Sequence, residues 1–364
     1  MNPKKYHEVV CMSAAIHQVA AQSGCSVVVD VGSGLGYLGQ VLHKSYNYKI
    51  IGLESKGCHT TGAEKRLHKT DSTMGIKNVT FELHDSQESM DQFATVIQQC
   101  CQELRQECDE KKNQRSAASG ISGNGLKSSD FLMEKHWDTD NTETEKVLMV
   151  GLHCCGDLTP IMMKYFKALD FIKGLCCVSC CFHRMKFLDD HNSNCINFPM
   201  SCVVRKLCQE LEWHPSLYGL RLAAQETRLG ITFIFIRMFE IVRVLLVLYS
   251  CRWGVQSQAD HEYHMKNVAY RGILQLYLNK DGSSPPLDKI KESLRELYSE
   301  QEQYFKYIEP ITALQVTLQP LLEWLIYKDR ELWLMEQGTN ATVKPIFDDF
   351  ISPRNLAIIA DKKS

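Results

Sequence analysis

The sequence predicts an α/β fold built on a mostly parallel sheet. Short β-branched runs alternate with segments of helical pattern through residues 26–97. Glycines follow directly after the first of these runs, as they do in a strand–turn–helix unit. Apolar residues make up 44% of the 364 residues and charged residues 23%, which is the balance of a chain that buries a core. The composition therefore excludes a mainly disordered, collagen-like or coiled-coil chain.

The first part of the chain predicts three strands and two helices. An N-terminal helix is expected over residues 3–22, and a second helix over 37–45. Strands are expected over 26–31, 49–53 and 79–83. Strands that alternate with helices at this spacing indicate parallel βαβ units.

A polar insertion over residues 98–146 interrupts the alternation. It is rich in Gln, Glu, Lys, Ser, Asn and Gly, and we expect a disordered loop over 111–145 after a helical start. Buried strands then follow at 147–152 and 174–179, joined by a helix.

The last part of the chain is mostly helical in pattern. Its strongest helix is expected over 314–335, and two short strands follow at 342–347 and 356–360. The predicted divisions are 1–97, 98–146, 147–183, 184–340 and 341–364.

One stretch, residues 231–249, is long and apolar enough to suggest a transmembrane span. It also carries Arg237, Glu240 and Arg243, each of which would be costly at a bilayer centre. We therefore predict a buried or interface segment, and no stable membrane insertion. Strand and helix both remain open for it, because the run is rich in Ile, Phe and Val.

The net charge of −2 excludes a global positive field of the kind that marks many nucleic-acid binders. A basic cluster over residues 65–69 is interpreted as a solvated face. The polar, charged start of the chain predicts no secretory or transit peptide. With sixteen cysteines, many of them adjacent, we expect reduced thiols and an intracellular location, in the cytoplasm or nucleus.

The most informative motif follows the first predicted strand, where an acid precedes a run of glycines. The run over Gly34–Gly39 also fits G-x-G-x-x-G, so a dinucleotide site is an alternative. Asp30 argues against it, because a carboxylate repels a pyrophosphate and attracts an amino group and a sulfonium. S-adenosylmethionine carries both cations. The motif therefore predicts a methyltransferase whose cofactor contacts Asp30, Gly32, Ser33, Gly34 and Gly36.

Two further acids lie near the ends of the second and third predicted strands. Glu54 is placed to accept hydrogen bonds from the ribose hydroxyls, and Asp85 to meet the adenine amino group. Ends of neighbouring parallel strands meet in one crevice, so the two acids and Asp30 are expected to converge. An ordinary turn with solvated acids is the alternative.

The loop after the fourth predicted strand, residues 152–157, should face the methyl group and the acceptor. His153 is expected to line the cofactor or act as a general base, because its pKa suits proton transfer near neutrality. Asp157 is expected to cap the next helix.

A cysteine-rich segment ends the fifth predicted strand. Cys177, Cys180 and His183 are ligand types that zinc accepts. However, successive side chains of a strand alternate between its faces, and no second C-x-x-C lies at finger spacing. We therefore predict no metal, and core packing for Cys176 and Cys177. The catalytic candidates are His153, Cys180, Cys181 and His183.

With these motifs in place, the chain resembles the methyltransferase-like protein 25 family. The matching segments run from one end of the sequence to the other: Asn2–Val9, Asp30–Gly36, Leu152–Asp157, Cys180–His183 with Phe198-Pro199, and Ser352–Asn355. A similar pair of Cys/His motifs occurs in a tRNA ribose 2′-O-methyltransferase family, which resembles only the core.

The resemblance implies a Rossmann-like class I methyltransferase sheet of seven strands, with a helical insertion between the fifth and sixth. It implies S-adenosylmethionine as cofactor and an unknown acceptor, RNA or protein. Two departures stand out. The chain looks N-terminally short for the family, and residues 229–251 form an atypical apolar insert of the kind that a splice or gene-model change produces. A non-catalytic S-adenosylmethionine-binding module is the main alternative, and a dinucleotide oxidoreductase the weakest.

Overall fold

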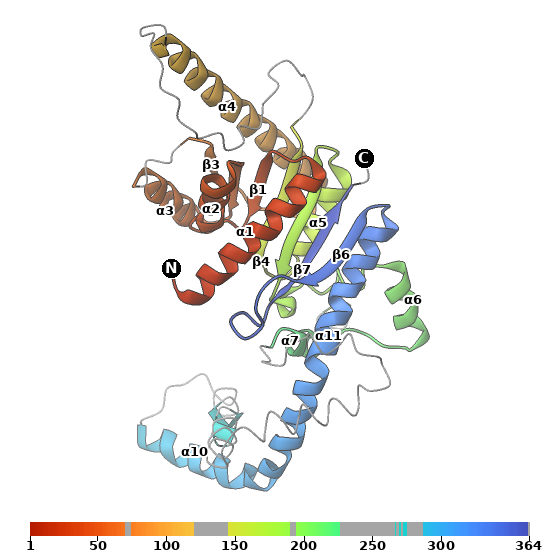
Figure 1. The fold of residues 1–364 in the computed structure, drawn as a ribbon. Helices are drawn as coiled ribbons and strands as arrows, with labels where there is room; N and C mark the ends of the chain where they lie inside the picture. Colours follow the sequence, from red (N-terminus) through yellow and green to blue (C-terminus); the bar gives the residue numbers. More distant parts are fainter. Residues whose placement is uncertain are drawn as a thin grey trace. The chain divides into compact units, whose positions relative to one another are not determined.

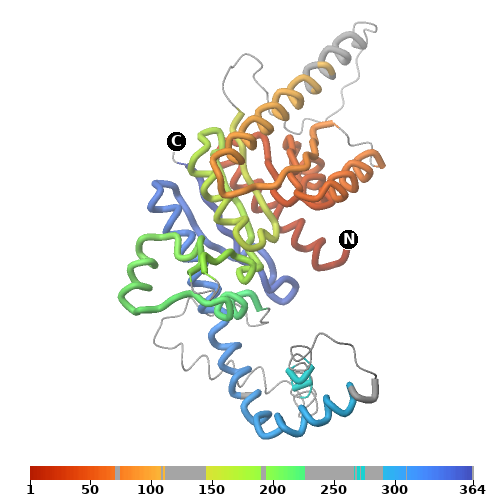
Figure 2. The backbone as a smooth tube through the Cα atoms, turned by 180° about the vertical axis from the view of Figure 1, so that it is seen from behind, coloured from red at the N-terminus to blue at the C-terminus, as the bar shows by residue number. Residues whose placement is uncertain are grey.

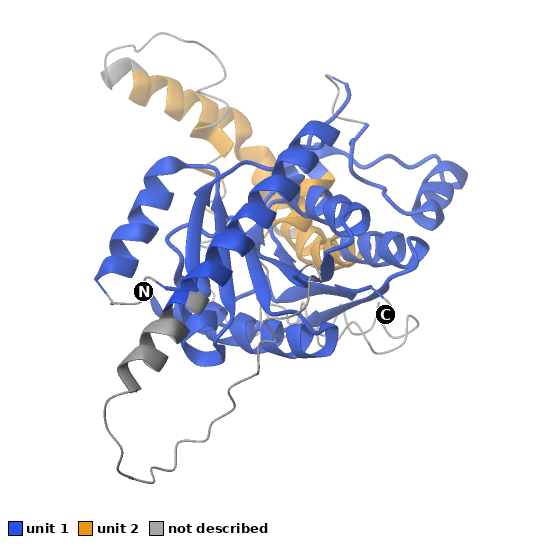
Figure 3. Ribbon diagram, turned by 90° about the horizontal axis from the view of Figure 1, so that it is seen from above, with its two compact units in different colours: residues 1–218, 325–364 blue, residues 219–324 orange. Residues whose placement is uncertain are grey.

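The computed structural model describes residues 1–69, 74–119, 145–189, 194–225, 266, 269–270, 272–274 and 287–362. These residues belong to two compact units: residues 1–218 with 325–364, and residues 219–324 (Figure 3). Among the described helices, none has the length and apolar character needed to span a bilayer. The apolar stretch 231–249, and the insert 229–251 that contains it, lie outside the described residues.

A sheet of seven strands forms the centre of the first unit. Its order is β3-β2-β1-β4-β5-β7-β6, and only β7 runs antiparallel to its neighbours. The strands are β1 (Val27–Val31), β2 (Lys49–Glu54), β3 (Ile76–Thr80), β4 (Val147–Cys154), β5 (Ile172–Ser179), β6 (Asn340–Pro345) and β7 (Leu356–Asp361). The predicted mixed α/β fold on a mostly parallel sheet of seven strands is confirmed.

The third strand begins earlier than the sequence predicted. Gly75, at φ 82°, makes the turn that leads into β3, so that pairing starts at Ile76 rather than at Val79. Ile76 pairs with Ile50 and is buried. The segment from Phe81 to Asp85 is therefore a loop beyond the carboxyl end of the sheet.

Helices cover both faces of this sheet. α1 (Pro3–Ser23), α2 (Tyr37–Tyr46) and α3 (Gly57–His68) share one core with alternate strand residues, among them Val28, Ile50 and Cys176. α1 lies across the near face of the sheet in Figure 1. Seen from behind in Figure 2, the other face carries α4 (Gln87–Ser119) and α5 (Leu158–Ala168).

The ends of α1 follow from its local sequence. The Asn2 side chain accepts a hydrogen bond from the Lys5 N–H at 2.8 Å, and Pro3 occupies the first turn, where no N–H is needed. Gly24 ends the helix at φ 65°, a conformation that glycine adopts without steric cost. The apolar stripe between these ends places Val9, Met12 and Ile16 in the core.

α4 corrects the expected extent of the polar loop. The helix runs on to Ser119, so residues 111–119 are helical where a disordered loop was predicted. Residues 111–119 contain Lys, Gln, Arg and Ala, which are good helix formers and can continue a helix even without an apolar stripe. Residues 120–144 lie outside the described part of the chain. Glu145 then ties the return of the chain to Ser26 and Arg105, at 3.0 and 2.8 Å.

The described elements between β5 and β6 are all helical. They are η1 (Phe182–Arg184), α6 (Cys202–Glu210), α7 (Leu217–Ala223), α10 (Leu287–Gln301), η3 (Glu302–Tyr307) and α11 (Ile308–Glu336). The strongest predicted helix lies within α11. The predicted division of the chain into five segments stays a prediction.

The C-terminal end of α11 belongs to the first unit and fixes the end of β5. The Tyr327 hydroxyl accepts from the Ser179 N–H at 3.1 Å and donates to the Leu356 carbonyl at 2.9 Å. The buried Arg330 guanidinium donates to the Ser179 hydroxyl at 2.6 Å. Strand β5 therefore ends at a position that buried polar contacts define, directly before the cysteine-rich segment.

Candidate functional site

The glycine-rich turn connects β1 to α2. Gly32, Gly34 and Gly36 all have positive φ, at 74°, 57° and 71°, so side chains at these positions would be strained. The N–H groups of Gly32 and Ser33 donate to the Leu53 carbonyl at 2.8 and 3.0 Å. A Cβ added to Gly34 would meet no atom within 4 Å. The turn is therefore held against β2 by its backbone and faces open space at Gly34.

Asp30 lies two residues before Gly32, near the end of β1, with 3% of its surface exposed. Burial raises the pKa of its carboxyl to about 7; Lys5 acts to lower it and Glu54 to raise it. Among the described residues, the structure assigns no hydrogen bond to this carboxylate. A buried carboxylate of this kind is stabilised by a cationic partner. The buried Asp30 carboxylate therefore fits a ligand that carries an amino group, as S-adenosylmethionine does.

Glu54 meets the same turn from the end of β2. Its carboxylate accepts from the Gly34 N–H at 3.0 Å and from the Lys56 N–H at 3.1 Å, and His59 Nδ1 lies 3.5 Å away. The structure thus brings Glu54 to the glycine turn beside Asp30, as adjacent strand ends predict. The Glu54 carboxylate stabilises the conformation of the glycine turn through its hydrogen bond with the Gly34 N–H.

Asp85 lies on the loop after β3. Its half-exposed carboxylate forms an ion pair with Lys164 Nζ of α5 at 2.6 Å. Lys164 also donates to the Asn197 side chain at 2.8 Å. Asp85 therefore pairs with α5 rather than with the glycine turn, and its adenine contact stays a prediction.

His153, near the end of β4, contacts a buried acid of α1. Its Nε2 lies 3.1 Å from Glu8 Oε2, and the Ser352 hydroxyl donates to Glu8 Oε1 at 2.7 Å. Burial of Glu8 acts to raise its pKa, but the hydrogen bonds from His153 and Ser352 outweigh it and the net shift is downward. His153 has φ 65°, a strained conformation for a residue with a side chain. The contact with Glu8 therefore fixes the orientation of the imidazole.

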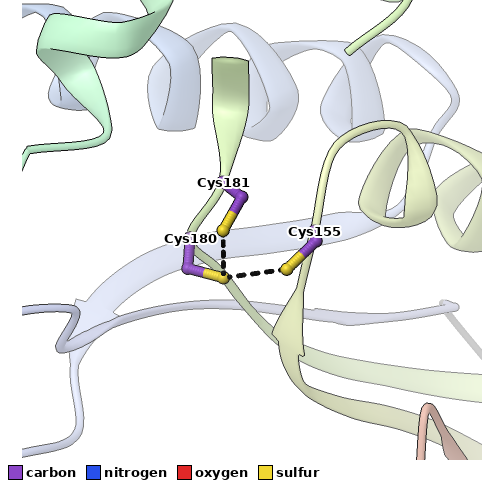
Figure 4. Close-up of side chains that lie close together, drawn as sticks. All are labelled: Cys155, Cys180 and Cys181. Carbon is purple, nitrogen blue, oxygen red and sulfur yellow. Dashed lines mark hydrogen bonds between the residues drawn. The ribbon is translucent and has the colours of Figure 1, made fainter. Parts of the chain in front are cut away.

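Three thiols converge beyond the ends of β4 and β5 (Figure 4). Cys155 Sγ lies 3.4 Å from Cys180 Sγ, and Cys180 Sγ lies 3.5 Å from Cys181 Sγ. The hydrogen bond from the Cys180 thiol lowers the pKa of Cys155, and burial opposes this effect. Because Cys180 gives its proton to that bond, its own pKa is raised. The cluster therefore favours a thiolate at Cys155.

The remaining residues of the cysteine-rich segment lie elsewhere. Cys176 and Cys177 are fully buried in β5 and take part in the core, as predicted. His183 lies in η1, and its ring is not part of the group formed by the three thiols. The structure thus brings two of the four catalytic candidates, Cys180 and Cys181, into one cluster and leaves His153 beside Glu8.

Asp157 stands at the N-terminus of α5, but its side chain makes no capping hydrogen bond there. Its carboxylate instead accepts from the Lys186 N–H and the Asn197 amide, both at 2.9 Å. Asp157 therefore occupies the N-cap position as predicted, but the predicted capping by its side chain is wrong. The carboxylate holds the segment that follows η1 against α5, because two long-range donors reach it.

Three groups at the site were not predicted from the sequence: Lys5, which interacts with Asp30, the Glu8–Ser352 pair beside His153, and Cys155 as the partner of Cys180. All except Cys155 lie in terminal segments far along the chain from the strand ends that they meet. The segments that carried the family resemblance did contain them, and this was the one signal available.

The order of the sheet, the glycine turn after β1 and a buried acid before it define a methyltransferase domain. A family model for this domain, described as "Methyltransferase domain", matches residues 4–187, and the chain belongs to this family. Methyltransferase domains of this kind use S-adenosylmethionine, so the predicted enzyme class and cofactor are confirmed.

Two curated relatives are similar to this chain over its whole length. The mouse "Probable methyltransferase-like protein 25" is 25% identical over all of this chain and 75% of its own length. Its human counterpart is 26% identical over the same shares. The predicted resemblance is confirmed. Among solved structures, an S-adenosylmethionine-dependent methyltransferase from Agrobacterium tumefaciens overlaps 52% of this chain and 47% of its own, at 9% identity and a TM-score of 0.26.

Proposed function

We propose that this chain transfers a methyl group from S-adenosylmethionine to an intracellular acceptor, with Asp30 and the glycine turn as the centre of the cofactor site. The observation that carries the proposal is the buried Asp30 carboxylate beside a turn that faces open space at Gly34. The bound cofactor supplies an electrophilic methyl carbon on a sulfonium. The chain supplies position and charge.

Each charged group near the turn has a distinct role in this proposal. Asp30 pairs with the amino group of the methionine portion, and Lys5 with its carboxylate, since the two side chains already interact electrostatically. Glu54 exchanges part of its contact with the turn for the ribose hydroxyls. Asp85, together with the loop after β3, borders the adenine.

His153 is the proposed base for an acceptor that loses a proton. If its Nε2 carries the hydrogen and donates to Glu8, its Nδ1 has a free lone pair. Glu8 is then a positioning residue that fixes this tautomer. Cys180, Cys181 and His183 lie on the loop after β5 and border the acceptor side.

The acceptor is proposed to be RNA or protein within the cell. The fourteen cysteines whose side chains the structure describes are all free thiols, which supports a reducing compartment. The Cys/His motifs, which are similar to those of a tRNA ribose methyltransferase family, support RNA.

Thermal melting of the full chain tests the proposal. S-adenosylmethionine and S-adenosylhomocysteine should each raise the melting temperature, because a ligand at a hundred times its Kd stabilises by about 2.7 kcal/mol. NADH is the control and should leave the melting temperature unchanged. A cooperative melt that only NADH shifts would contradict the proposal and favour the dinucleotide alternative. Labelled methyl transfer to RNA and protein fractions then separates an enzyme from a binding module.

A further inference from the structure

The three thiols of Cys155, Cys180 and Cys181 are brought together by two separate loops. Cys155 follows β4, and Cys180 with Cys181 follows β5 (Figure 4). The Gly156 N–H donates to the Cys181 carbonyl at 3.1 Å, so the backbone itself joins the two loops beside the sulfurs. This geometry does not depend on the thiols, because a backbone hydrogen bond sets it.

The spacing of the sulfur atoms suits a common metal ligand set. All three Sγ atoms lie within 4.8 Å of one another, with nearest separations of 3.4 and 3.5 Å. Sulfurs around a tetrahedral zinc, at Zn–S distances of about 2.3 Å, stand about 3.8 Å apart. A disulfide would use only two of the three sulfurs and needs about 2.05 Å between them.

Burial and charge separate these thiols from the other adjacent cysteines. Cys154, Cys176 and Cys177 are almost fully buried in β4 and β5, whereas the three clustered thiols are partly exposed and can be reached from solvent. The Arg184 guanidinium also interacts with Cys155. Three thiolates around a divalent cation carry a net charge of −1, which a neighbouring guanidinium offsets.

We propose that Cys155, Cys180 and Cys181 bind one zinc ion through three thiolates. Soft sulfur ligands select zinc over the harder divalent cations, and zinc displaces the thiol protons on binding. The fourth coordination position is taken by a ligand that is not one of these three thiols. The site differs from the set Cys177, Cys180 and His183 that the sequence spacing suggested, because Cys177 lies inside β5.

The test measures zinc bound to the full chain after dialysis against zinc under reducing conditions. We expect about one zinc per chain, and cobalt(II) in its place should give thiolate charge-transfer absorption. Cys155→Ser, Cys180→Ser and Cys181→Ser should each weaken zinc binding at least about tenfold and reduce that absorption. Cys202→Ser, at an exposed thiol of α6, is the matched control and should bind zinc as the parent chain does.

Two results would overturn the proposal. One is a folded parent chain that binds no zinc and gives no cobalt absorption. The other is a Cys155–Cys180 disulfide in place of metal. Melting of each variant without metal checks that the fold survives the substitution. The shift that S-adenosylmethionine produces in the same samples tests the methyltransferase proposal separately, since its predicted contacts do not include these thiols.

Discussion

Asp30 shows how one residue can couple ligand binding to stability. Its carboxyl has a pKa raised from 3.8 to about 7, so the folded state holds a proton that the unfolded chain releases. The stability that this difference contributes is present below about pH 4 and is lost as the pH rises through 7. The wild-type chain therefore keeps a buried acid that works against folding at neutral pH, as binding sites often do.

Replacing Asp30 by Asn should separate function from stability. The affinity for S-adenosylhomocysteine should fall about 10- to 100-fold, because a charge-assisted hydrogen bond to the amino group is lost. The melting temperature should stay equal or rise, and the gain should grow between pH 4 and 7. Calorimetry and melting curves measure both. Unchanged affinity in the variant would contradict the role assigned to Asp30.

The affinity of the wild-type chain should itself depend on pH. Binding needs the ionised carboxyl, whose fraction rises about eightfold between pH 6 and 7.5 for a pKa of about 7. The affinity for S-adenosylhomocysteine should rise in parallel, and binding below pH 7 should release the proton of the Asp30 carboxyl. In the Asp30→Asn variant this dependence should vanish. Calorimetry in buffers of different ionisation enthalpy detects the released protons, and a flat wild-type profile would argue against the assignment.

At the scale of elements, the sequence predicted those features that depend on neighbouring residues. The strand, acid and glycines of residues 28–36 set the first βα turn locally, and the structure keeps it. The start of β3 was missed because Gly75, and not the apolar pattern, sets it. The length of α4 was missed because its polar end still favours a helix. The thiol cluster was missed because Cys155 and Cys180 lie on different strand ends, and only the sheet order brings them together.

Gly156 sets the distance between the loops after β4 and β5. It has φ 58°, and an added Cβ would come within 2.7 Å of the Arg184 carbonyl oxygen. Gly24, at φ 65°, would place a Cβ in open space. Gly24→Ala should lower the free energy of unfolding by about 1–2 kcal/mol, which is what a left-handed backbone conformation costs a residue with a side chain. Gly156→Ala should lower the free energy of unfolding by about 1–3 kcal/mol more than Gly24→Ala does, because the added methyl group clashes with the Arg184 backbone. Equal losses in denaturant unfolding of the two variants would contradict this account.

At the scale of the whole molecule, Glu8 joins three distant parts of the chain. It lies in the N-terminal helix and accepts hydrogen bonds from Ser352 near the C-terminus and from His153 near the end of β4. Next to it, His7 Nε2 accepts from the Asp348 N–H at 3.0 Å. The closure of the first unit around its sheet therefore depends on a buried carboxylate that holds both terminal segments. Contacts between residues this far apart leave no local pattern, which is why the sequence did not predict them.

Acid should reveal the contribution of Glu8 to stability. Its pKa lies below the usual 4.5 in the folded state, so the stability it contributes is present above that pH and is lost as the pH falls through it. Glu8→Gln should lower the free energy of unfolding by about 1–3 kcal/mol at pH 7, because one buried donor loses its acceptor. The difference from wild type should narrow as the pH falls through the lowered pKa of Glu8 and protonates the wild-type carboxylate. Glu64→Gln, at an exposed position in α3, is the control and should change stability little. A Glu8→Gln difference that stays constant from pH 7 to pH 3.5 would show that the carboxylate charge does not hold the terminal segments together.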